Sequence, residues 1–314
     1  MVAAILLCVV SVRTSEAGWL RAWGIDDGGV NDYGYTDVPS GEDFVAVTAE
    51  AQRCVALRAD GSLVSWGAGY NNTIAFPAGN EFAAVETGSY HGLALRQDGS
   101  LAAWGLNIYG QAAVPPGNDF AAIAAGTYHS LALKTDGSLV GWGSNDFGES
   151  DVPAGNDFVA IAGGYLFSVA LKADGSLVAW GYDYFGQTDV PPGNDFVGIA
   201  CGGYHSLALK GDGSLVGWGV NGSGQTDVPA GNDFVDIAAG GWHSLALKDD
   251  GSLAGWGFNN HGQSDVPSGN HFVAIAGGWF HSVAIQVPEP STIVLLCTLA
   301  ATLALFHVLR RHRK

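Results

Sequence analysis

The sequence predicts an all-β protein built from seven copies of one 38-residue unit, and three observations support this prediction. A Trp-Gly pair recurs along the chain, an Asp-Gly pair precedes it in six copies, and each end of the repeat region holds about half a unit. No stretch between the two chain ends has helical periodicity. Because the copies repeat with little variation, one unit can explain the strands of all of them.

The Trp-Gly pair marks the period of the repeat. The first interval between pairs is 43 residues and the other five are 38, and the five extra residues fall in the loop 25–36. The seven pairs begin at Trp23, Trp66, Trp104, Trp142, Trp180, Trp218 and Trp256.

The unit from Phe120 to Pro153 shows the expected strand order. Apolar stretches at 120–126 and 128–134 are followed by the turn Asp136-Gly137, a third stretch at 138–143 and a loop. Asp-Gly between two apolar stretches is typical of a β-hairpin with a tight primed turn, in which both residues take positive φ. A length of 38 residues predicts about four short antiparallel strands per unit.

The two ends of the repeat region indicate that the units form a closed ring. Residues 18–24 supply the second half of a unit and residues 272–285 supply the first half. Strands such as 138–143 carry apolar or minimal side chains on both faces, so each sheet must be covered on both sides. The 269 residues from 18 to 286 leave none for the capping unit of an open array. The sequence therefore predicts a closed seven-bladed β-propeller over residues 18–286.

The composition narrows the class of partner. Charged residues make up only 14% of the chain and hydrophobic residues 47%, which excludes a charged disordered tail and a coiled coil. Residues 18–286 hold 8 Lys and Arg against 28 Asp and Glu. A body this acidic repels phosphate backbones, so no nucleic acid partner is expected. Cys54 and Cys201 occupy different repeat positions and are not expected to form a disulfide.

The two chain ends have features of processing segments. Residues 1–17 combine an apolar run from Val2 to Val10 with Ser15-Glu16-Ala17, which predicts a signal peptide, with a buried strand as the alternative. At the other end, residues 287–292 precede an apolar run at 293–309 and a basic tail at 310–314. The apolar run predicts a short transmembrane helix of about 25 Å, with the basic tail in the cytoplasm.

The C-terminal segments resemble a known sorting signal. The order of Pro288-Glu289-Pro290, an apolar span and a tail that begins with Arg310 and Arg311 resembles the PEP-CTERM signal, which exosortases read in bacteria that make extracellular polysaccharide. This resemblance implies an exported protein that is anchored by residues 293–309 before processing and then lies at the cell surface or in the extracellular matrix. A plain single-pass anchor is the alternative.

The repeat itself also resembles a known family. The run 202–209, followed by Asp212-Gly213, Trp218-Gly219 and Gly224-Gln225, resembles the repeat of the regulator-of-chromosome-condensation family, in seven in-phase copies. The phrase at 224–229 is similar to the short unit of bacterial β-lactamase inhibitory protein II. The resemblance implies a propeller that contacts its partner through aromatic residues in the corresponding loops. The nucleotide-exchange role of the founding member is not implied for an exported, acidic chain.

One repeat position holds a histidine in five copies, with Phe167 and Arg53 in the other two. Equivalent atoms around a seven-membered ring lie too far apart to share one metal ion, and Phe167 indicates that the position accepts an apolar side chain. We expect these histidines to be structural, each bonding its strand to a neighbouring turn. They are His91, His129, His205, His243 and His281.

Catalysis and cofactors are not predicted. The Asp-Gly turns lack the several oxygen ligands of a calcium loop, and hairpin geometry explains them without metal. The polar residues that differ between copies form no recognisable pair of nucleophile and base, so no catalytic residue, metal or cofactor is expected. These residues are Arg53, Glu86, Asp236, His261 and His271.

Aromatic residues at the loop before the repeated histidine form the predicted partner-binding site. The identity of these residues varies while the scaffold stays constant, and Tyr and Trp dominate binding hot spots. The alternative is that the rings pack sideways against the next blade. The predicted site comprises Tyr90, Tyr128, Tyr165, Tyr204, Trp242, Trp279 and Phe280. A second set, interrupted in three copies, ranks below it and comprises Tyr33, Tyr109, Phe147 and Phe185.

These observations predict an exported propeller that binds a protein or a glycan without catalysis. One alternative is a secreted enzyme inhibitor of the β-lactamase-inhibitor type, and a second is a polysaccharide-acting enzyme with its site at the axis. Exposed loop aromatics favour binding, whereas two carboxylates in a central pocket favour the enzyme.

Overall fold

The computed structural model describes residues 17–25, 34–51, 53–67 and 76–289. These residues form seven three-stranded antiparallel sheets, which we number 1 to 7 in chain order. Sheets 1 to 3 are β2 (Phe44–Glu50), β3 (Arg53–Arg58), β4 (Leu63–Trp66); β5 (Phe82–Thr87), β6 (His91–Arg96), β7 (Leu101–Gly105); β8 (Phe120–Ala125), β9 (His129–Lys134), β10 (Leu139–Gly143). Sheets 4 to 7 are β11 (Phe158–Gly163), β12 (Phe167–Lys172), β13 (Leu177–Gly181); β14 (Phe196–Cys201), β15 (His205–Lys210), β16 (Leu215–Gly219); β17 (Phe234–Ala239), β18 (His243–Lys248), β19 (Leu253–Gly257); β20 (Phe272–Gly277), β21 (His281–Gln286), β1 (Trp19–Gly24).

The chain is therefore an all-β repeat protein of blade-like sheets, but each sheet has three strands rather than the expected four. The remainder of each unit, such as 144–157, contains no further strand among the described residues and forms turns and irregular backbone. This stretch contains glycines and a Val-Pro pair. Proline cannot donate a hydrogen bond to a strand ladder, so the segment cannot extend the sheet.

The Asp-Gly turns join the second and third strands, as predicted, but the turn type is different. In sheet 3 the N–H of Gly137 donates to the carbonyl of Lys134 at 3.0 Å, and Gly137 has φ of 84°. Apart from His271, only glycines among the described residues have positive φ, so Asp136 does not take it. This geometry is a type I turn followed by a glycine bulge rather than a primed turn. The Asp136 carboxylate instead accepts the N–H and hydroxyl of Ser138, at 2.9 and 2.6 Å.

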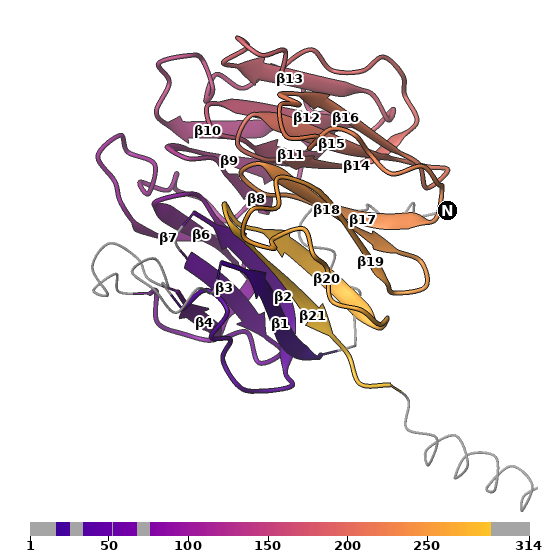
Figure 1. The fold of residues 1–314 in the computed structure, drawn as a ribbon. Coiled ribbons are helices and arrows are strands. Elements are labelled where there is room, and N and C mark those ends of the chain that lie inside the picture. The colour runs from indigo at the N-terminus through magenta and orange to yellow at the C-terminus, as the bar shows by residue number, and fades with distance from the viewer. Residues whose placement is uncertain (1–16, 26–33, 52, 68–75, 290–314) are drawn as a thin grey trace, which may run out of the picture.

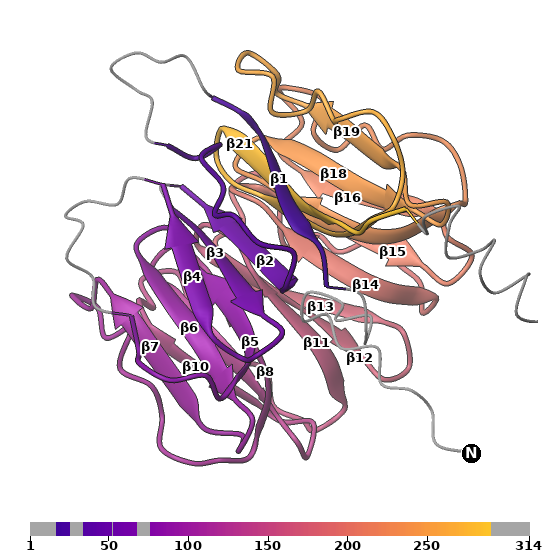
Figure 2. The same ribbon diagram turned by 90° about the horizontal axis from the view of Figure 1, so that it is seen from below.

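Each sheet packs on the next through its own cluster of buried side chains. In one cluster Leu131 of sheet 3 packs with Phe158 and Ile161 of sheet 4. Six such clusters join successive sheets, and a seventh joins sheet 7 to sheet 1, where Leu20 and Val283 pack with Phe44. Figures 1 and 2 show the same arrangement, with the yellow end of the chain beside the indigo beginning.

The tryptophans of the Trp-Gly pairs link neighbouring sheets through hydrogen bonds. The indole N–H of Trp142 donates to the carbonyl of Gln111, which lies in the loop that follows sheet 2, at 2.9 Å. The same bond joins Trp23 of β1 to the carbonyl of Gln263 in the loop that follows sheet 6. The glycine after each tryptophan has positive φ, for example 101° at Gly143, which side chains disfavour.

The predicted pairing of the two ends of the repeat region is confirmed. Strand β1 pairs antiparallel with β21 over six residues, from Trp19 opposite Gln286 to Gly24 opposite His281. The chain then continues through Val287, which is buried and whose N–H donates to the carbonyl of His271 at 2.9 Å.

The predicted processing segments fall almost entirely outside the described residues. Residues 1–16 of the expected signal peptide and the expected span 293–309 are not described, and neither are Pro290, Arg310 and Arg311. Pro288 and Glu289 are described and exposed. Within the part of the chain that is described, no helix is long and apolar enough to span a membrane.

Candidate functional site

Two loops of each sheet leave it at the same end, and these loops carry the aromatic residues. In sheet 3 Gly143 pairs with His129, so the loop 126–128 before β9 lies beside the loop that begins at Ser144 after β10. All seven predicted binding residues lie in the first kind of loop. We call this end the aromatic face, and the end with the Asp-Gly turns the opposite face.

The structure brings the predicted residues together in pairs from neighbouring sheets. The rings of Tyr90 and Tyr128 stack with centroids 5.4 Å apart, and those of Tyr204 and Trp242 lie 5.6 Å apart. Tyr165 lies 5.0 Å from Tyr204. Tyr90 is 36% exposed, and the other four are half-buried. The rings therefore pack sideways on one another and still keep part of their surface in solvent.

Two of the predicted residues meet although their sheets are not neighbours. Tyr165 precedes the second strand of sheet 4 and Trp279 precedes that of sheet 7, yet their ring centroids are 6.5 Å apart. Small residues make room for this contact, because a Cβ added to Gly241 would lie 3.2 Å from the backbone of Trp279. These two rings therefore lie over the middle of the aromatic face.

The second aromatic set is more exposed than the first. Tyr109, Phe147 and Phe185 each donate their backbone N–H to a buried Gln or Glu two residues later; the Tyr109 bond to Gln111 Oε1 measures 2.9 Å. The buried acceptor fixes the loop, so the aromatic side chain points outward. The exposed fractions are 50%, 49% and 46%, respectively. Tyr33 of this set lies outside the described residues.

The two predicted sets form one surface rather than two. Tyr109 makes an edge contact with Tyr128 at 5.3 Å, and Phe185 makes one with Tyr204 at 5.6 Å. Sequence reasoning missed Tyr182 and Tyr184, which belong to the loop of Phe185. The repeat held a weak signal for them, because Phe258 occupies the repeat position of Tyr182 and Tyr70 that of Tyr184, while the remaining copies have no aromatic residue there.

Tyr184 is the most exposed large apolar side chain of the described residues, at 78%, and its ring lies 4.9 Å from Phe185. We call the rings on this face the aromatic surface. It comprises Tyr90, Tyr109, Tyr128, Phe147, Tyr165, Tyr182, Tyr184, Phe185, Tyr204, Trp242, Phe258, His261, Trp279 and Phe280. Ring contacts join eleven of its members into one group, and Tyr90, Tyr109 and Tyr128 form a second group.

Two phenols of this surface, those of Tyr128 and Tyr204, have raised pKa values. Partial burial, with the neighbouring phenols of Tyr90 and Tyr165 as smaller causes, raises the pKa of Tyr128 to about 12. Burial also raises the pKa of Tyr204. Tyr128 and Tyr204 therefore offer neutral phenols to a partner.

A central cavity of about 160 Å³ lies among the first strands of all seven sheets. Most of its lining is Ala, Gly and Ile, but sheets 1 and 2 contribute Thr48, Glu50, Glu86 and Thr87. The hydroxyls of Thr48 and Thr87 are 2.9 Å apart. The cavity therefore has one polar side, and it contains two carboxyl groups, which is the feature that would favour an enzyme.

Both carboxyl groups are shifted toward their neutral forms by burial. Burial raises the pKa of Glu50 to about 7, although hydrogen bonds from Ser89 and Trp279 oppose the shift. The Ser89 hydroxyl lies 3.5 Å from Glu50 Oε1. Burial likewise raises the pKa of Glu86 to about 8, opposed by a hydrogen bond from Thr48. The bond to Trp279 connects the cavity to the aromatic surface.

The repeated histidines lie beneath the aromatic face and are buried, as predicted, but their partner is different. His129 Nε2 lies 2.8 Å from Ser168 Oγ, at the start of the second strand of the next sheet rather than in a turn. His281 instead meets the Cys54 thiol at 3.0 Å. Cys54 and Cys201 do not form a disulfide with each other. Burial lowers the pKa of His129 to about 4. The histidines therefore act as neutral links between sheets.

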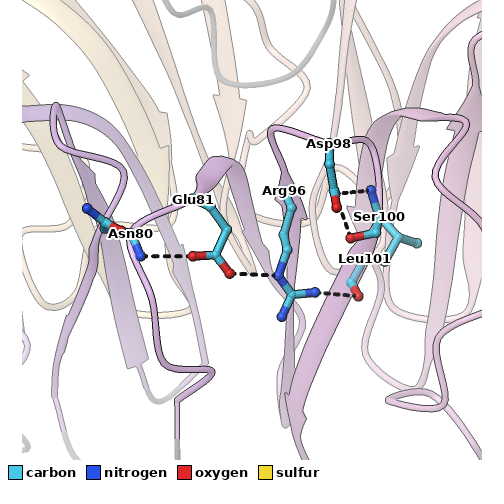
Figure 3. Close-up of polar contacts among 6 residues, drawn as sticks. All are labelled: Asn80, Glu81, Arg96, Asp98, Ser100 and Leu101. Atoms are coloured by element: carbon cyan, nitrogen blue, oxygen red, sulfur yellow. Dashed lines mark hydrogen bonds and ion pairs between the residues drawn. The ribbon is translucent and has the colours of Figure 1, made fainter.

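The opposite face repeats the same few contacts from sheet to sheet. In sheet 2 Arg96 pairs with Glu81 at 3.1 Å and donates to the carbonyl of Leu101, while Asp98 caps the turn at Ser100 (Figure 3). The Arg96 guanidinium also lies 5.5 Å from the Phe82 ring centroid. Five further sheets have an equivalent ion pair and cation–π contact.

Comparison with known protein families gives the repeat a name. The regulator of chromosome condensation (RCC1) repeat matches five segments, at residues 82–111, 120–149, 158–187, 196–225 and 234–263. Five repeats of this chain match the RCC1 repeat. Each matched RCC1 segment runs from the first phenylalanine of a sheet to the buried Gln or Glu that holds the outward aromatic loop. The repeat match thus covers sheets 2 to 6 and includes the two loops that each of them has at the aromatic face.

Solved structures show the same fold. Prp20p from Saccharomyces cerevisiae, whose binding to Gsp1p and histones has been characterised, matches with a TM-score of 0.73 and 18% identity over 92% of this chain and 96% of its own. Human WBSCR16 matches with a TM-score of 0.70 and 18% identity, over 87% of this chain and all of its own. The ectodomain of the Physcomitrella patens receptor kinase CR4 matches with a TM-score of 0.64 and 26% identity, over 78% and 70%. A search of curated proteins finds no match.

Proposed function

We propose that this RCC1-repeat protein is an exported, non-catalytic propeller that binds a protein or a glycan through the aromatic surface. The observation that carries the proposal is the gathering of contacting rings on one face, which includes exposed members such as Tyr184 and Phe185. Exposed apolar patches of this kind mark interaction sites in soluble proteins. Aromatic residues also dominate the energetics of such interfaces.

We further infer that the seven sheets close into a seven-bladed β-propeller. The cluster that joins sheet 7 to sheet 1 and the pairing of β1 with β21 both support closure. A ring of this kind leaves no sheet face uncovered, which fits strands that are apolar on both sides. Closure also places all the aromatic loops around one centre.

Export is part of the same proposal. It rests on the signal-peptide pattern at 1–17 and on the order of Pro-Glu-Pro motif, apolar span and basic tail at 287–314, with an exosortase-type enzyme as the processing partner. Pro288 and Glu289 are exposed and therefore open to such an enzyme. Mass spectrometry of the mature surface protein tests this point: cleavage near Pro290 is expected, and an intact tail that includes Arg310 would contradict it.

The aromatic surface also supports the alternative of a secreted enzyme inhibitor. Inhibition of a β-lactamase panel by the purified protein would distinguish this alternative from a surface adhesin. The third function, a polysaccharide-acting enzyme, is favoured by Glu50 and Glu86 in the central cavity. However, about 160 Å³ is smaller than the roughly 300–1,000 Å³ of ordinary ligand pockets, and a sugar chain does not fit.

Replacement of Trp242 by alanine tests the proposed binding function. Trp242 is half-buried and contacts Tyr204, so its indole supplies contact area on the aromatic surface. We expect the affinity for a partner captured from the native extracellular matrix to fall by roughly thirtyfold or more, because an aromatic anchor contributes about 2 kcal/mol or more. The matched control is Glu81→Gln on the opposite face. Loss of several kcal/mol of folding stability with unchanged affinity would contradict the proposal.

A further inference from the structure

We propose that the partner is a protein that inserts a lysine side chain between Tyr165 and Trp279 into the central cavity, where the ammonium group pairs with Glu50 and Glu86. The inference rests on the proposed binding function and names the chemistry of its partner. It selects a protein over a glycan, and it gives the two carboxyl groups a role that the repeat scaffold does not require.

The first argument is that the two carboxyl groups depart from the repeat. The position of Glu50 is glycine in all six other copies, and the position of Glu86 is alanine in five of them and Thr48 in the sixth. The other sheets fold with these small residues, so the scaffold does not need carboxyl groups here. Neither side chain forms an ion pair among the described residues.

The second argument is energetic. Burial of a carboxyl group disfavours its charged form, and the pKa values of about 7 for Glu50 and about 8 for Glu86 reflect that cost. A cation in the cavity would remove the penalty, because an opposite charge within a few ångströms stabilises the ionised form. The free cavity is therefore built with an uncompensated preference for positive charge.

The third argument concerns the route into the cavity. The rings of Tyr165 and Trp279, from sheets 4 and 7, meet across the aromatic face with centroids 6.5 Å apart. The Trp279 side chain is also close enough to the cavity-lining Glu50 to oppose the rise in the pKa of its carboxyl group. Aromatic faces attract ammonium groups, and a lysine has a long apolar stem that can lie along rings while its charged end reaches further. A cavity of about 160 Å³ holds a group of that size.

The surrounding charge also favours a cationic partner over a neutral one. Residues 18–286 hold 28 acidic and 8 basic residues, and six of the basic ones are paired on the opposite face. A metal ion is a poorer fit, because the described residues contain no group of three or more His, Cys, Asp and Glu side chains suited to a metal. Acidic surroundings speed the approach of a basic protein.

The pairing has a defined pH dependence. Glu50 faces Ser89 and Trp279, Glu86 faces Thr48, and the only other ionisable side chain among the described cavity-lining residues is the thiol of Cys201. Above pH 8 both carboxyl groups are ionised even without a ligand, whereas lysine keeps its charge to about pH 10. Binding therefore strengthens from pH 6 to pH 9.

The test uses two small probes, Nα-acetyl-lysine methylamide and its uncharged norleucine analogue, titrated into the protein at low salt. Shifts of the Trp279 indole N–H resonance, assigned with Trp279→Phe, report binding. We expect the lysine probe to bind at least tenfold more tightly at pH 9 than at pH 6, and the norleucine probe to bind at least tenfold more weakly than the lysine probe at pH 9. Equal binding of the two probes, or no shift with either, would overturn the inference.

Charge-removal variants make the test specific to the cavity. The double substitution Glu50→Gln and Glu86→Gln should abolish lysine binding, whereas Glu81→Gln removes the same kind of charge on the opposite face and should leave it unchanged. If the double variant does not fold, the comparison of the two probes on the unsubstituted protein still tests the inference. If the lysine probe fails but Trp242→Ala weakens partner binding, this inference falls alone. If Trp242→Ala has no effect on affinity, the proposed function itself fails.

Discussion

The two ends of the sheets follow different rules. At the opposite face six sheets repeat an ion pair, a cation–π contact and a capped turn with nearly the same geometry, as Arg96 and Glu81 illustrate. At the aromatic face the equivalent positions differ between sheets, from Gly203 and Gly241 to Tyr165 and Trp279. Side chains that recur in every copy serve the scaffold, whereas those that differ are available for recognition.

The strands that line the central cavity also combine residues that repeat with residues that differ between sheets. Five sheets present alanine where sheets 1 and 2 present Thr48 and Glu86, although all seven sheets pack in the same way. A repeat protein can therefore place an individual group at its centre without altering the fold. The predictions below separate scaffold residues from recognition residues by the property that each change affects.

The largest expected effect comes from removing β1, because that strand joins the two ends of the scaffold. Deletion of residues 18–24 removes six paired residues and the buried Leu20. Loss of one buried leucine costs about 2–5 kcal/mol, and about 1 kcal/mol moves the Tm of a domain this large by about 2–4 °C. We expect calorimetry to record a fall in Tm of roughly 10 °C or more. An unchanged Tm would contradict the closure of the ring.

Phe158→Ala tests a scaffold residue near the opposite face. Phe158 is 3% exposed and packs in the cluster between sheets 3 and 4. Its truncation should lower the free energy of unfolding by about 3–5 kcal/mol in urea titrations. The matched aromatic control is Tyr184→Ala on the aromatic face, which should change stability by about 0.5 kcal/mol or less. Equal losses in the two variants would show that the proposed division between the ends is wrong.

His129→Phe tests the buried layer beneath the aromatic face and copies Phe167 of the next sheet. Burial holds the pKa of His129 at about 4 in the folded chain. The unfolded chain protonates near pH 6.5 and the folded one does not, so stability falls as pH drops below about 6.5. The substitution should reduce the loss between pH 7 and pH 5 by about 2 kcal/mol in urea titrations. If the unsubstituted protein and His129→Phe lost the same stability between pH 7 and pH 5, burial of a neutral His129 would not explain the loss.

Glu50 and Glu86 affect the pH dependence of stability in the opposite direction to His129, because they lower stability as the pH rises. Their folded pKa values lie above the ordinary value of 4.5, so the folded chain keeps protons that the unfolded chain releases. Their contribution to stability is complete below pH 4.5 and is lost as pH rises toward 8. Acid therefore weakens the histidine links, while alkali weakens the polar side of the cavity.

Local patterns predicted the strand order well, because local chemistry determines it. The Asp-Gly pairs mark the turns between second and third strands, and each Trp-Gly pair marks the end of a third strand. The expected fourth strand was wrong because length alone suggested it, while the proline that every unit carries after its third strand prevents it. The primed turn was also wrong, because the Asp136 carboxylate caps the turn at Ser138 and only Gly137 needs positive φ.

The sequence predicted residues of the candidate site but not the contacts between distant sheets that bring them together. Equivalent repeat positions indicated that Tyr90 and Tyr128 share a face, since neighbouring copies are placed side by side. The contact of Tyr165 with Trp279 depends on how distant sheets meet, which no local pattern contains. The sequence analysis did not single out Glu50. A signal for it existed, since every other copy has glycine at this repeat position.

Hydrogen–deuterium exchange of the protein with and without its captured partner tests the central claim most directly. Scaffold and recognition lie at opposite ends of every sheet, so the position of new protection decides between them. We expect slowed exchange in the aromatic loops at 126–128, 164–166, 182–186 and 240–242, with no change in the turns at 135–138 and 173–176. Protection confined to those turns would contradict the account and assign binding to the opposite face.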